Sequence, residues 1–321
     1  MKKSLIAFIL IFMLVLSGCG MKDNDKQGSN DNGSSKSPYH RIVSLMPSNN
    51  DKQGSNDNGS SKSPYHRIVS LMPSNTEILY ELGLGKYIVG VSTVDDYPKD
   101  VKKGKKQFDA LNLNKEELLK AKPDLILAHE SQKATANKVL SSLEKQGIKV
   151  VYVKDAQSID ETYNTFKQIG KLTHHDKQAE QLVEETKDNI DKVIDSIPAH
   201  HKKSKVFIEV SSKPEIYTAG KHTFFNDMLE KLEAQNVYSD INGWNPVTKE
   251  SIIKKNPDIL ISTEAKTRSD YMDIIKKRGG FNKINAVKNT RIEVVNGDEV
   301  SRPGPRIDEG LKELRDAIYR K

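Results

Sequence analysis

Short segments rich in β-branched and apolar residues alternate with helical segments along most of this chain, and this alternation restricts the possible folds most strongly. Such segments are short enough for strands that are buried on both faces. They begin at Ile68, Ile88, Leu125, Val150, Val206, Ile259 and Ile292. Strands that alternate with helices favour parallel sheets covered by helices, so we expect an α/β fold.

One long helix divides these strands into two groups. Apolar residues recur every three or four positions from Ala179 to Ile197, with no breaker between Lys177 and Ser196. Strand segments lie on both sides of this helix. We therefore predict an N-terminal lobe over residues 66–173, a connecting helix within residues 174–203, and a C-terminal lobe over residues 204–321.

Two stretches of the chain, residues 114–128 and 248–262, match each other without gaps. Each is typical of a capped helix, a Pro-Asp turn and a buried strand, with Asn114 and Thr248 as the N-caps. These caps place Glu116 and Glu250 in the first helical turn, where a carboxylate stabilises the helix dipole by about 0.3–1 kcal/mol. The residues alone favour that role, and they leave open a matched pair of surface carboxylates on two related lobes.

The start of the chain has the pattern of an export signal. Lys2 and Lys3 precede an apolar run from Leu5 to Leu16, which is shorter than the roughly 20 residues of a membrane-spanning helix. The next residues, Leu16-Ser-Gly-Cys19, resemble the lipobox of bacterial lipoproteins, and Cys19 is the only cysteine in the chain. We expect removal of residues 1–18 as a signal peptide and lipidation of Cys19 on the outer face of a cell membrane, in a Gram-positive setting. An ordinary secretory signal with a chance cysteine is the alternative.

Residues 24–49 recur without a change as residues 50–75, which indicates a recent duplication and not a structural repeat. The polar half of each copy cannot bury a core, so we predict a lipid-anchored flexible tether over residues 19–65. The other half is typical of a first strand, and only the second copy leads into a helix, with Ser74 or Asn75 as its N-cap. Residues 67–72 therefore fill the strand position, while residues 41–46 stay in the tether.

The composition and motifs argue against several classes of function. The net charge of +7 is spread through mixed Lys/Glu runs, without a basic block interleaved with aromatic residues, so we expect no nucleic-acid partner. The sequence lacks a phosphate-binding glycine loop after a strand, a His-Glu-x-x-His motif, a Gly-x-Ser-x-Gly motif and a candidate cysteine nucleophile. The chain is therefore predicted not to be an enzyme.

An ordered set of motifs resembles one family. The motifs are Arg67-Ile-Val-Ser-Leu-Met-Pro-Ser-Asn-Thr-Glu77, Val89-Gly-Val91, Asp96-Tyr-Pro98, Lys122-Pro-Asp-Leu-Ile126, Gly147-Ile-Lys-Val-Val151 and Arg302-Pro-Gly-Pro-Arg-Ile307. They resemble the cobalamin and iron-chelate substrate-binding proteins of ABC importers, and the cobalamin-binding branch most closely. The resemblance covers essentially all of residues 66–321. It implies two Rossmann-like lobes joined by a single long α-helix, with the ligand in the cleft between them.

The resemblance also implies a function and partners. The chain would be an extracytoplasmic lipoprotein that captures a cobalamin-type corrinoid or related metal chelate and delivers it to an ABC permease and its ATPase. One glutamate per lobe docks on the permease in that family, and these positions match Glu116 and Glu250 here. We expect a monomer with no cofactor besides its ligand. A ferric siderophore or haem is the alternative ligand, and a surface adhesion or sensor module is the alternative outside transport.

The resemblance extends to the ligand site. Phe108 and Trp244 stand where the cobalamin-binding relatives have tryptophans, Tyr217 where they have a phenylalanine, and Asp298 where a loop acid contacts the ligand. Ring faces suit a large, flat and partly apolar ligand. A core role is the alternative for Trp244, although Gly243-Trp-Asn-Pro246 has a loop-like composition.

Cationic residues at the expected cleft leave the ligand open. His129, Lys221, His222, Arg302 and Arg306 would suit an anionic ferric siderophore through charge-assisted hydrogen bonds. His129 directly follows a predicted strand, at the position where open α/β sheets bind ligands, so it is a candidate ligand of a bound metal centre or a hydrogen-bonding loop residue. Arg306 precedes the apolar helical stripe Ile307, Leu311, Leu314 and Ile318, so it has bracing of that helix as an alternative role.

Deletion of residues 24–49 removes one copy of the duplicated segment and keeps one strand together with its helix. We expect the melting temperature and the ligand affinity to stay unchanged, because the remaining copy supplies every residue that the fold needs. Thermal unfolding and ligand titration of the two chains test this. A clear loss of either quantity would show that the first copy belongs to the folded protein.

Overall fold

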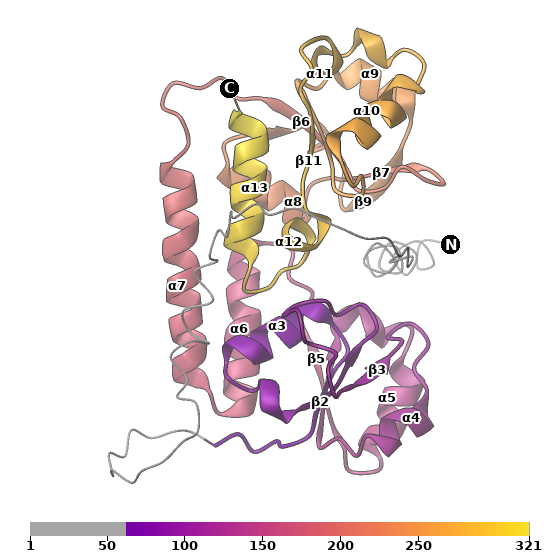
Figure 1. The fold of residues 1–321 in the computed structure, drawn as a ribbon, viewed down its shortest axis with the longest axis vertical. Coiled ribbons are helices and arrows are strands. Elements are labelled where there is room, and N and C mark those ends of the chain that lie inside the picture. Colours follow the sequence, from indigo (N-terminus) through magenta and orange to yellow (C-terminus); the bar gives the residue numbers. More distant parts are fainter. Residues whose placement is uncertain (1–61, 321) are drawn as a thin grey trace, which may run out of the picture.

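The computed structural model describes residues 62–320, so the predicted signal peptide, Cys19 and the first copy of the duplicated segment lie outside the described residues. Two lobes follow one another along the long axis of the molecule, and the helix α7 (Asp176–Asp195) runs beside both of them (Figure 1). The two-lobe α/β architecture predicted from the sequence is confirmed.

The N-lobe contains a parallel sheet of five strands in the order β3-β2-β1-β4-β5. The strands are β1 (Ile68–Ser70), β2 (Ile88–Ser92), β3 (Lys106–Phe108), β4 (Leu125–His129) and β5 (Lys149–Val153). The helices are α3 (Pro73–Glu81), α4 (Lys115–Lys120), α5 (Asn137–Glu144) and α6 (Ile159–Thr173), with the short 3-10 turns η1 (Gly85–Tyr87) and η2 (Glu130–Lys133). The side chains of β1 and β4 are buried throughout, as expected for strands covered on both faces.

The C-lobe contains a parallel sheet in the order β11-β10-β6-β8 and an antiparallel ribbon of two strands. The sheet strands are β6 (Lys205–Glu209), β8 (Gln235–Asn236), β10 (Ile259–Ser262) and β11 (Ile292–Val294), and the ribbon strands are β7 (Ile216–Ala219) and β9 (Trp244–Val247). The helical segments are α8 (Phe224–Lys231), α9 (Lys249–Lys255), α10 (Arg268–Lys276), η3 (Phe281–Lys283), α11 (Asn285–Lys288), α12 (Gly297–Ser301) and α13 (Ile307–Tyr319).

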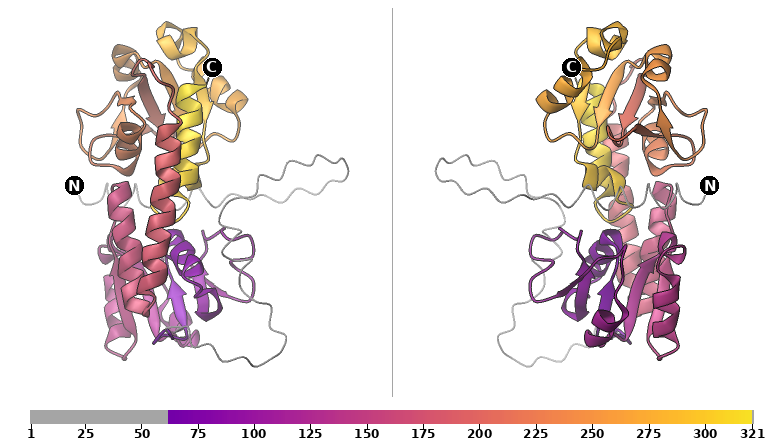
Figure 2. Two further views of the ribbon diagram at one scale, coloured as in Figure 1. Left: turned by 90° about the vertical axis from the view of Figure 1, so that its left-hand side faces the viewer. Right: turned by 90° about the vertical axis from the view of Figure 1, so that its right-hand side faces the viewer.

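Helices α6, α7 and α13 link the lobes through one continuous core. Figure 2 shows α7 passing along both lobes, and its buried residues pack in the same cluster as the apolar residues of α13. The turn from α6 to α7 is tight, because a side chain on Gly170 would collide with Ala179. The predicted inward stripe of the last helix is confirmed, since Ile307, Leu311 and Leu314 are fully buried.

The internal match of the sequence corresponds to equivalent structures in the two lobes. Asn114 and Thr248 cap α4 and α9 through their side chains, as predicted. Each following aspartate fastens the first residue of the neighbouring strand segment through a reciprocal pair of bonds. The Asp124 amide donates to the carbonyl of Arg67 at 3.0 Å, while its carboxylate accepts from the Arg67 amide at 3.0 Å. Asp258 bonds both backbone groups of Lys205 in the same way, at 2.8 and 3.1 Å.

Two local predictions are wrong. Helix α3 begins at Pro73, not after Ser74 or Asn75, because proline at the first helical position needs no amide hydrogen and has a preset φ. Asn75 is buried and donates to the carbonyl of Ala128 at 3.3 Å instead of capping the helix. The segment around Trp244 is the strand β9 and not a loop, and its Pro246 pairs with Tyr217 of β7 in a ribbon of only two strands.

Candidate functional site

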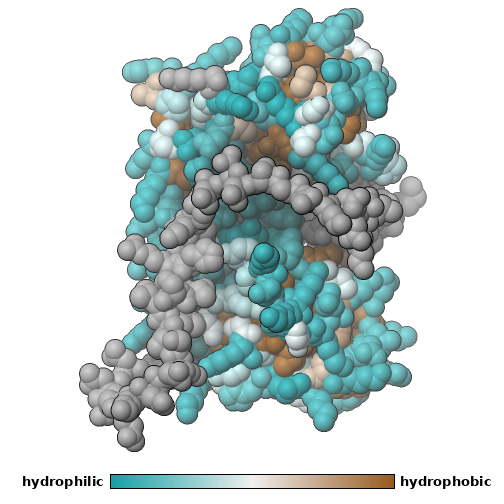
Figure 3. Space-filling view, in the orientation of Figure 1, coloured by the Kyte–Doolittle hydropathy of each residue, from teal (hydrophilic) through white to brown (hydrophobic). Residues whose placement is uncertain are grey.

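The carboxyl ends of the two parallel sheets point toward each other across the space between the lobes. In the N-lobe, β4 and β5 end at His129 and Val153, and in the C-lobe β11 leads into α12 and a linker that contacts the N-lobe. The surface is hollowed between the lobes (Figure 3). Open parallel sheets bind ligands outside the carboxyl ends of their strands, so this cleft is the candidate site.

A buried arginine–carboxylate network joins the two lobes at the back of the cleft. Arg306 donates from Nε and Nη2 to both oxygens of Glu77, at 3.0 and 2.9 Å. Arg302 approaches the same carboxylate at 3.4 Å and also bonds Asp96 and Asp298. Glu77 is only 2% exposed. The bidentate geometry fixes α3 of the N-lobe against the linker between α12 and α13.

Carboxylates of this network bind the guanidinium groups of both arginines. Burial opposes the charge of Arg302, but its hydrogen bond with Asp96 and the charges of Asp298 and Glu77 outweigh burial and raise the pKa of the guanidinium above its usual value. The Arg306 guanidinium also bonds Glu299 at 3.3 Å and stacks over the Tyr97 ring at 4.2 Å. Arg302 and Arg306 were predicted as partners of an anionic ligand, and here they bind carboxylates of the protein.

Two carboxyl groups, Glu81 beside the network and Glu299 within it, are in environments that disfavour their charge. Burial, followed by the charges of Glu77 and Glu185, raises the pKa of Glu81 to about 7. Burial and the charge of Glu313 likewise raise the pKa of Glu299 to about 7. Five carboxyl groups, those of Glu77, Glu81, Asp96, Asp298 and Glu299, therefore lie close to the two guanidinium groups.

His129 ends β4 at the floor of the cleft and is held by protein groups on both ring nitrogens. Its Nδ1 lies 2.7 Å from the Ser131 hydroxyl, and its Nε2 lies 3.5 Å from a carboxylate oxygen of Asp155. Burial lowers its pKa, against the opposing charge of Asp155. The metal ion of a bound chelate could coordinate His129 only if it displaced Ser131 or Asp155 from a ring nitrogen. The arrangement therefore favours the hydrogen-bonding role of His129. Within residues 62–320, no group of three or more His, Cys, Asp or Glu side chains is placed to hold a metal ion.

The C-lobe wall carries the predicted aromatic pair. Trp244 pairs with Ala219, and Pro246 with Tyr217, so Trp244 and Tyr217 project from one face of the β7–β9 ribbon. Both are partly exposed. The Trp244 ring packs edge-on against Phe225 at 5.7 Å between centroids, which anchors one side of the indole and leaves surface for a ligand. Lys221 and His222 follow β7 and are exposed.

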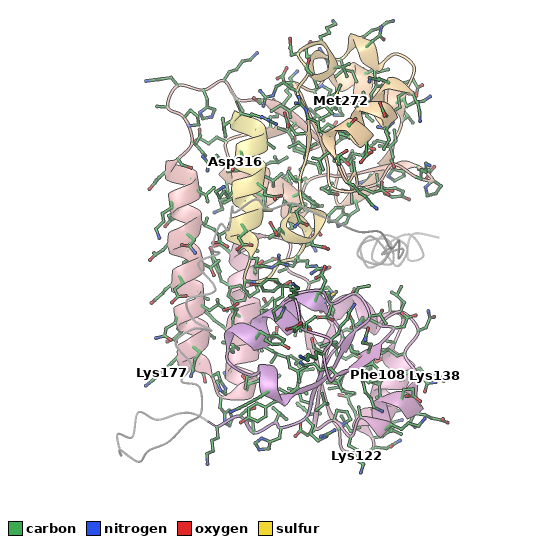
Figure 4. The ribbon with its side chains drawn as sticks, in the orientation of Figure 1. Phe108, Lys122, Lys138, Lys177, Met272 and Asp316 are labelled. Atoms are coloured by element: carbon green, nitrogen blue, oxygen red, sulfur yellow. The ribbon has the colours of Figure 1, made fainter. Side chains whose placement is uncertain are left out.

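Two other predicted contact residues, Phe108 and Asp298, are less accessible to a ligand. Phe108 ends β3 but is only 4% exposed, because its ring fills the space over Gly90 in the N-lobe core (Figure 4). The Phe108 ring would have to turn out of that core to touch a ligand. It is therefore less exposed than the sequence-based prediction of a ligand contact requires. Asp298 lies in α12, where its carboxylate accepts from Arg302 at 2.7 Å. Ligand contact by either residue stays a prediction.

The two predicted docking glutamates are exposed, one on each lobe. They lie in the first turns of α4 and α9, which are on the side of the molecule away from α7 (Figure 1). Neither makes an ion pair with another described residue.

The site also uses residues that the sequence did not single out, namely Glu77, Asp96 and Asp155. Glu77 and Asp96 lie inside the quoted motifs, and a carboxylate within the apolar segment that forms α3 was the available signal for Glu77.

The comparison with known proteins identifies the family. The family model described as periplasmic binding protein matches residues 68–298. The chain belongs to the periplasmic binding protein family. It is 40% identical over 98% of its length to an uncharacterized ABC transporter substrate-binding lipoprotein, YvrC, of Bacillus subtilis, and covers 96% of that protein. It is 28% identical to a vitamin B12-binding protein of Pectobacterium atrosepticum, over 72% of this chain and 81% of that one.

Solved structures agree with this assignment. A crystal structure from Staphylococcus epidermidis, described as a possible iron-binding (periplasmic solute-binding) protein, is 77% identical, with a TM-score of 0.76 over 80% of this chain and 99% of that chain. The vitamin B12-binding protein BtuF of Vibrio cholerae is 22% identical, with a TM-score of 0.66 over 79% of this chain and 97% of that chain, and shows the same fold. Within residues 62–320, the periplasmic binding protein described here has no helix that is long and apolar enough to cross a membrane.

Replacement of Arg306 by methionine leaves the buried Glu77 carboxylate without its bidentate partner. We expect a loss of about 3–5 kcal/mol in the free energy of unfolding, because an uncompensated buried charge is costly. The double variant E77M/R306M removes both charges and should recover most of that loss. Urea unfolding of the three chains measures both effects. Equal stability of R306M and the unchanged protein would show that the pair does not hold the lobes together.

Proposed function

We propose that this periplasmic binding protein is the lipid-anchored substrate-binding subunit of an ABC importer, and that it captures a cobalamin-type corrinoid or a related metal chelate in the inter-lobe cleft. The observation that carries the proposal is the cleft itself. Two parallel sheets present their carboxyl ends to one another, and a helix and a buried ion network hold them at a fixed separation. The relative from Bacillus subtilis, which carries the name of an ABC transporter substrate-binding lipoprotein, supports it.

The cleft favours aromatic recognition over recognition by arginine. Tyr217 and Trp244 offer ring surface on one wall, which suits a large and partly apolar ring system. Arg302 and Arg306 are engaged by carboxylates of the protein, which weakens the case for an anionic ferric siderophore. Lys221 and His222 remain exposed beside the ribbon and are suited to a smaller acidic group, such as a haem propionate. A ferric siderophore or haem stays the alternative ligand.

The remaining parts of the proposal concern partners and location. Cys19 carries the lipid anchor on the outer face of the cell membrane, and the chain acts as a monomer without catalysing a reaction. Glu116 and Glu250 dock on the permease, which works with its ATPase. Their support is the equivalent placement of two exposed carboxylates on two related helices. The alternative, a surface adhesion or sensor module, needs no such matched pair.

Titration of intrinsic fluorescence tests the ligand. Trp244 is the only tryptophan in the chain. We expect cobalamin to quench its emission with saturation, because the bound corrin lies within reach of the indole, and we expect haem and a panel of ferric siderophores to bind more weakly. W244F removes the signal, and competition with labelled ligand should then show weaker binding. Failure of every compound in the panel to bind would contradict the ligand class as a whole.

Charge reversal tests the transport role separately. The double variant E116K/E250K should abolish uptake of the ligand by cells while its affinity in solution stays unchanged, because both positions lie outside the cleft. The matched control is E144K/D273K, which reverses one exposed acid on each lobe on α5 and α10. The control should transport normally. Normal uptake by E116K/E250K would exclude the docking role and favour the module outside transport.

A further inference from the structure

The amino ends of the N-lobe strands lie at the end of this lobe that is farthest from the C-lobe. Ile68, Ile88, Leu125 and Lys149 lie in one row of the parallel register, so the residues that precede them share one edge of the sheet. Figure 4 shows Lys122, which precedes β4, at this end. Every strand here has a basic side chain either shortly before it or as its first residue, as Lys106 in β3 and Lys149 in β5. We call them the N-lobe basic face, defined by Arg67, Lys86, Lys103, Lys106, Lys122 and Lys149.

The basic side chains of this face make no salt bridge within residues 62–320. The Arg67 guanidinium donates to the backbone carbonyls of Lys122 and Ala121 at 2.8 and 2.7 Å. Asp124, the acid within the same edge, uses both carboxylate oxygens to accept the amides of His66 and Arg67. Asp124 keeps its negative charge, and Lys106 also interacts with the Glu117 carboxylate, so two acids offset part of the six positive charges and the remainder is available to an external partner.

Two tyrosine rings lie beside lysines of this region, namely Lys86 of the basic face and Lys105, which directly precedes β3. The Lys86 ammonium lies 5.1 Å from the centroid of the Tyr87 ring, and the Lys105 ammonium lies 5.5 Å from that of Tyr80. Both rings are partly buried, and His66 packs against Tyr87 at 5.4 Å. Tyrosine is enriched at membrane–water interfaces, where its ring meets an apolar surface and its hydroxyl meets water.

The course of the chain shows which surface this face meets. The described chain begins at Lys62 and enters β1 at this same end of the N-lobe (Figure 1). The proposed anchor, Cys19, precedes Lys62 in the sequence, so the connection to the bilayer leaves the folded protein beside the basic face. The far end of the C-lobe also exposes Lys202, Lys203 and Lys205, but the chain does not lead from there to the anchor.

We propose that the N-lobe basic face rests on the anionic lipid headgroups of the membrane that anchors the chain. This inference rests on the proposed function for the anchor at Cys19. Lysines near an anionic surface are attracted to the headgroup phosphates. Their electrostatic attraction adds to the membrane affinity of the lipid anchor and is reversible. In this orientation, which belongs to the protein before it docks on the permease, the C-lobe stands away from the bilayer, and the cleft stays clear of the surface by the depth of the N-lobe.

Vesicle binding tests the face without the anchor. The full mature chain with C19S cannot be acylated, and its partition into phosphatidylcholine vesicles is measured by sedimentation with and without phosphatidylglycerol. We expect binding that requires phosphatidylglycerol and falls with added salt, because salt screens exposed charges. In this background K103Q/K106Q/K149Q should lower the partition coefficient by at least about tenfold. The matched control K202Q/K203Q/K205Q removes the same charge from the far end of the C-lobe and should leave it unchanged.

The outcomes separate this inference from the proposed function. Equal losses of vesicle binding in the two triple variants would show that net charge alone attracts the protein to the membrane, and would contradict the proposed role of the N-lobe basic face. Absence of binding to phosphatidylglycerol vesicles would overturn it as well. Reduced uptake in cells by K103Q/K106Q/K149Q with Cys19 intact, together with unchanged vesicle binding, would overturn the lipid contact and assign the face to an acidic protein surface. Ligand titration of each variant is the independent control, because a failure to bind any chelate contradicts the proposed function and leaves the vesicle result standing.

Discussion

The buried pair of Glu77 and Arg306 is the contact on which the geometry of the cleft depends. The packed helices α6, α7 and α13 connect the lobes through one core on one side of the molecule. The pair adds a second connection on the side of the cleft where α13 begins, and Arg302 extends it to Asp96. A buried ion pair adds little stability compared with an apolar contact, but breaking it is costly. Its effect is therefore to make one relative position of the lobes strongly preferred.

The same contact limits which ligands the cleft can recognise. Guanidinium groups in a cleft ordinarily suggest an anionic ligand, and the sequence allowed that interpretation for Arg302 and Arg306. The carboxylate partners of these arginines argue against that interpretation, because a ligand anion would have to compete with Glu77 and Asp298 for N–H donors that are already used. Recognition then depends on the ring surfaces of Tyr217 and Trp244. The interaction that fixes the lobes thus also favours a ligand with a large apolar area.

Regular elements could be predicted from this sequence because their signals are local. The caps at Asn114 and Thr248 and the apolar stripe of α13 act within a few residues, and all of them are present. The ribbon strands β7 and β9 were missed because each has only four residues and β9 contains a proline, and they are stable only when paired with each other. The ion network was not predictable for a different reason. Glu77 and Arg302 are 225 residues apart, and no local pattern reports a contact over that distance.

Burial explains the remaining differences at the site. Phe108 and His129 have the residue types and strand-end positions of ligand contacts, yet the ring of Phe108 fills the space left by Gly90, and His129 is fixed by Ser131 and Asp155. A strand end places a side chain near the cleft, but the packing of the neighbouring strands decides whether it reaches the surface. Ribbon residues differ in this respect, because a two-stranded ribbon at the margin of a lobe has one face that the core does not cover. The aromatic contacts of the cleft are therefore expected on β7 and β9 more than on the central strands.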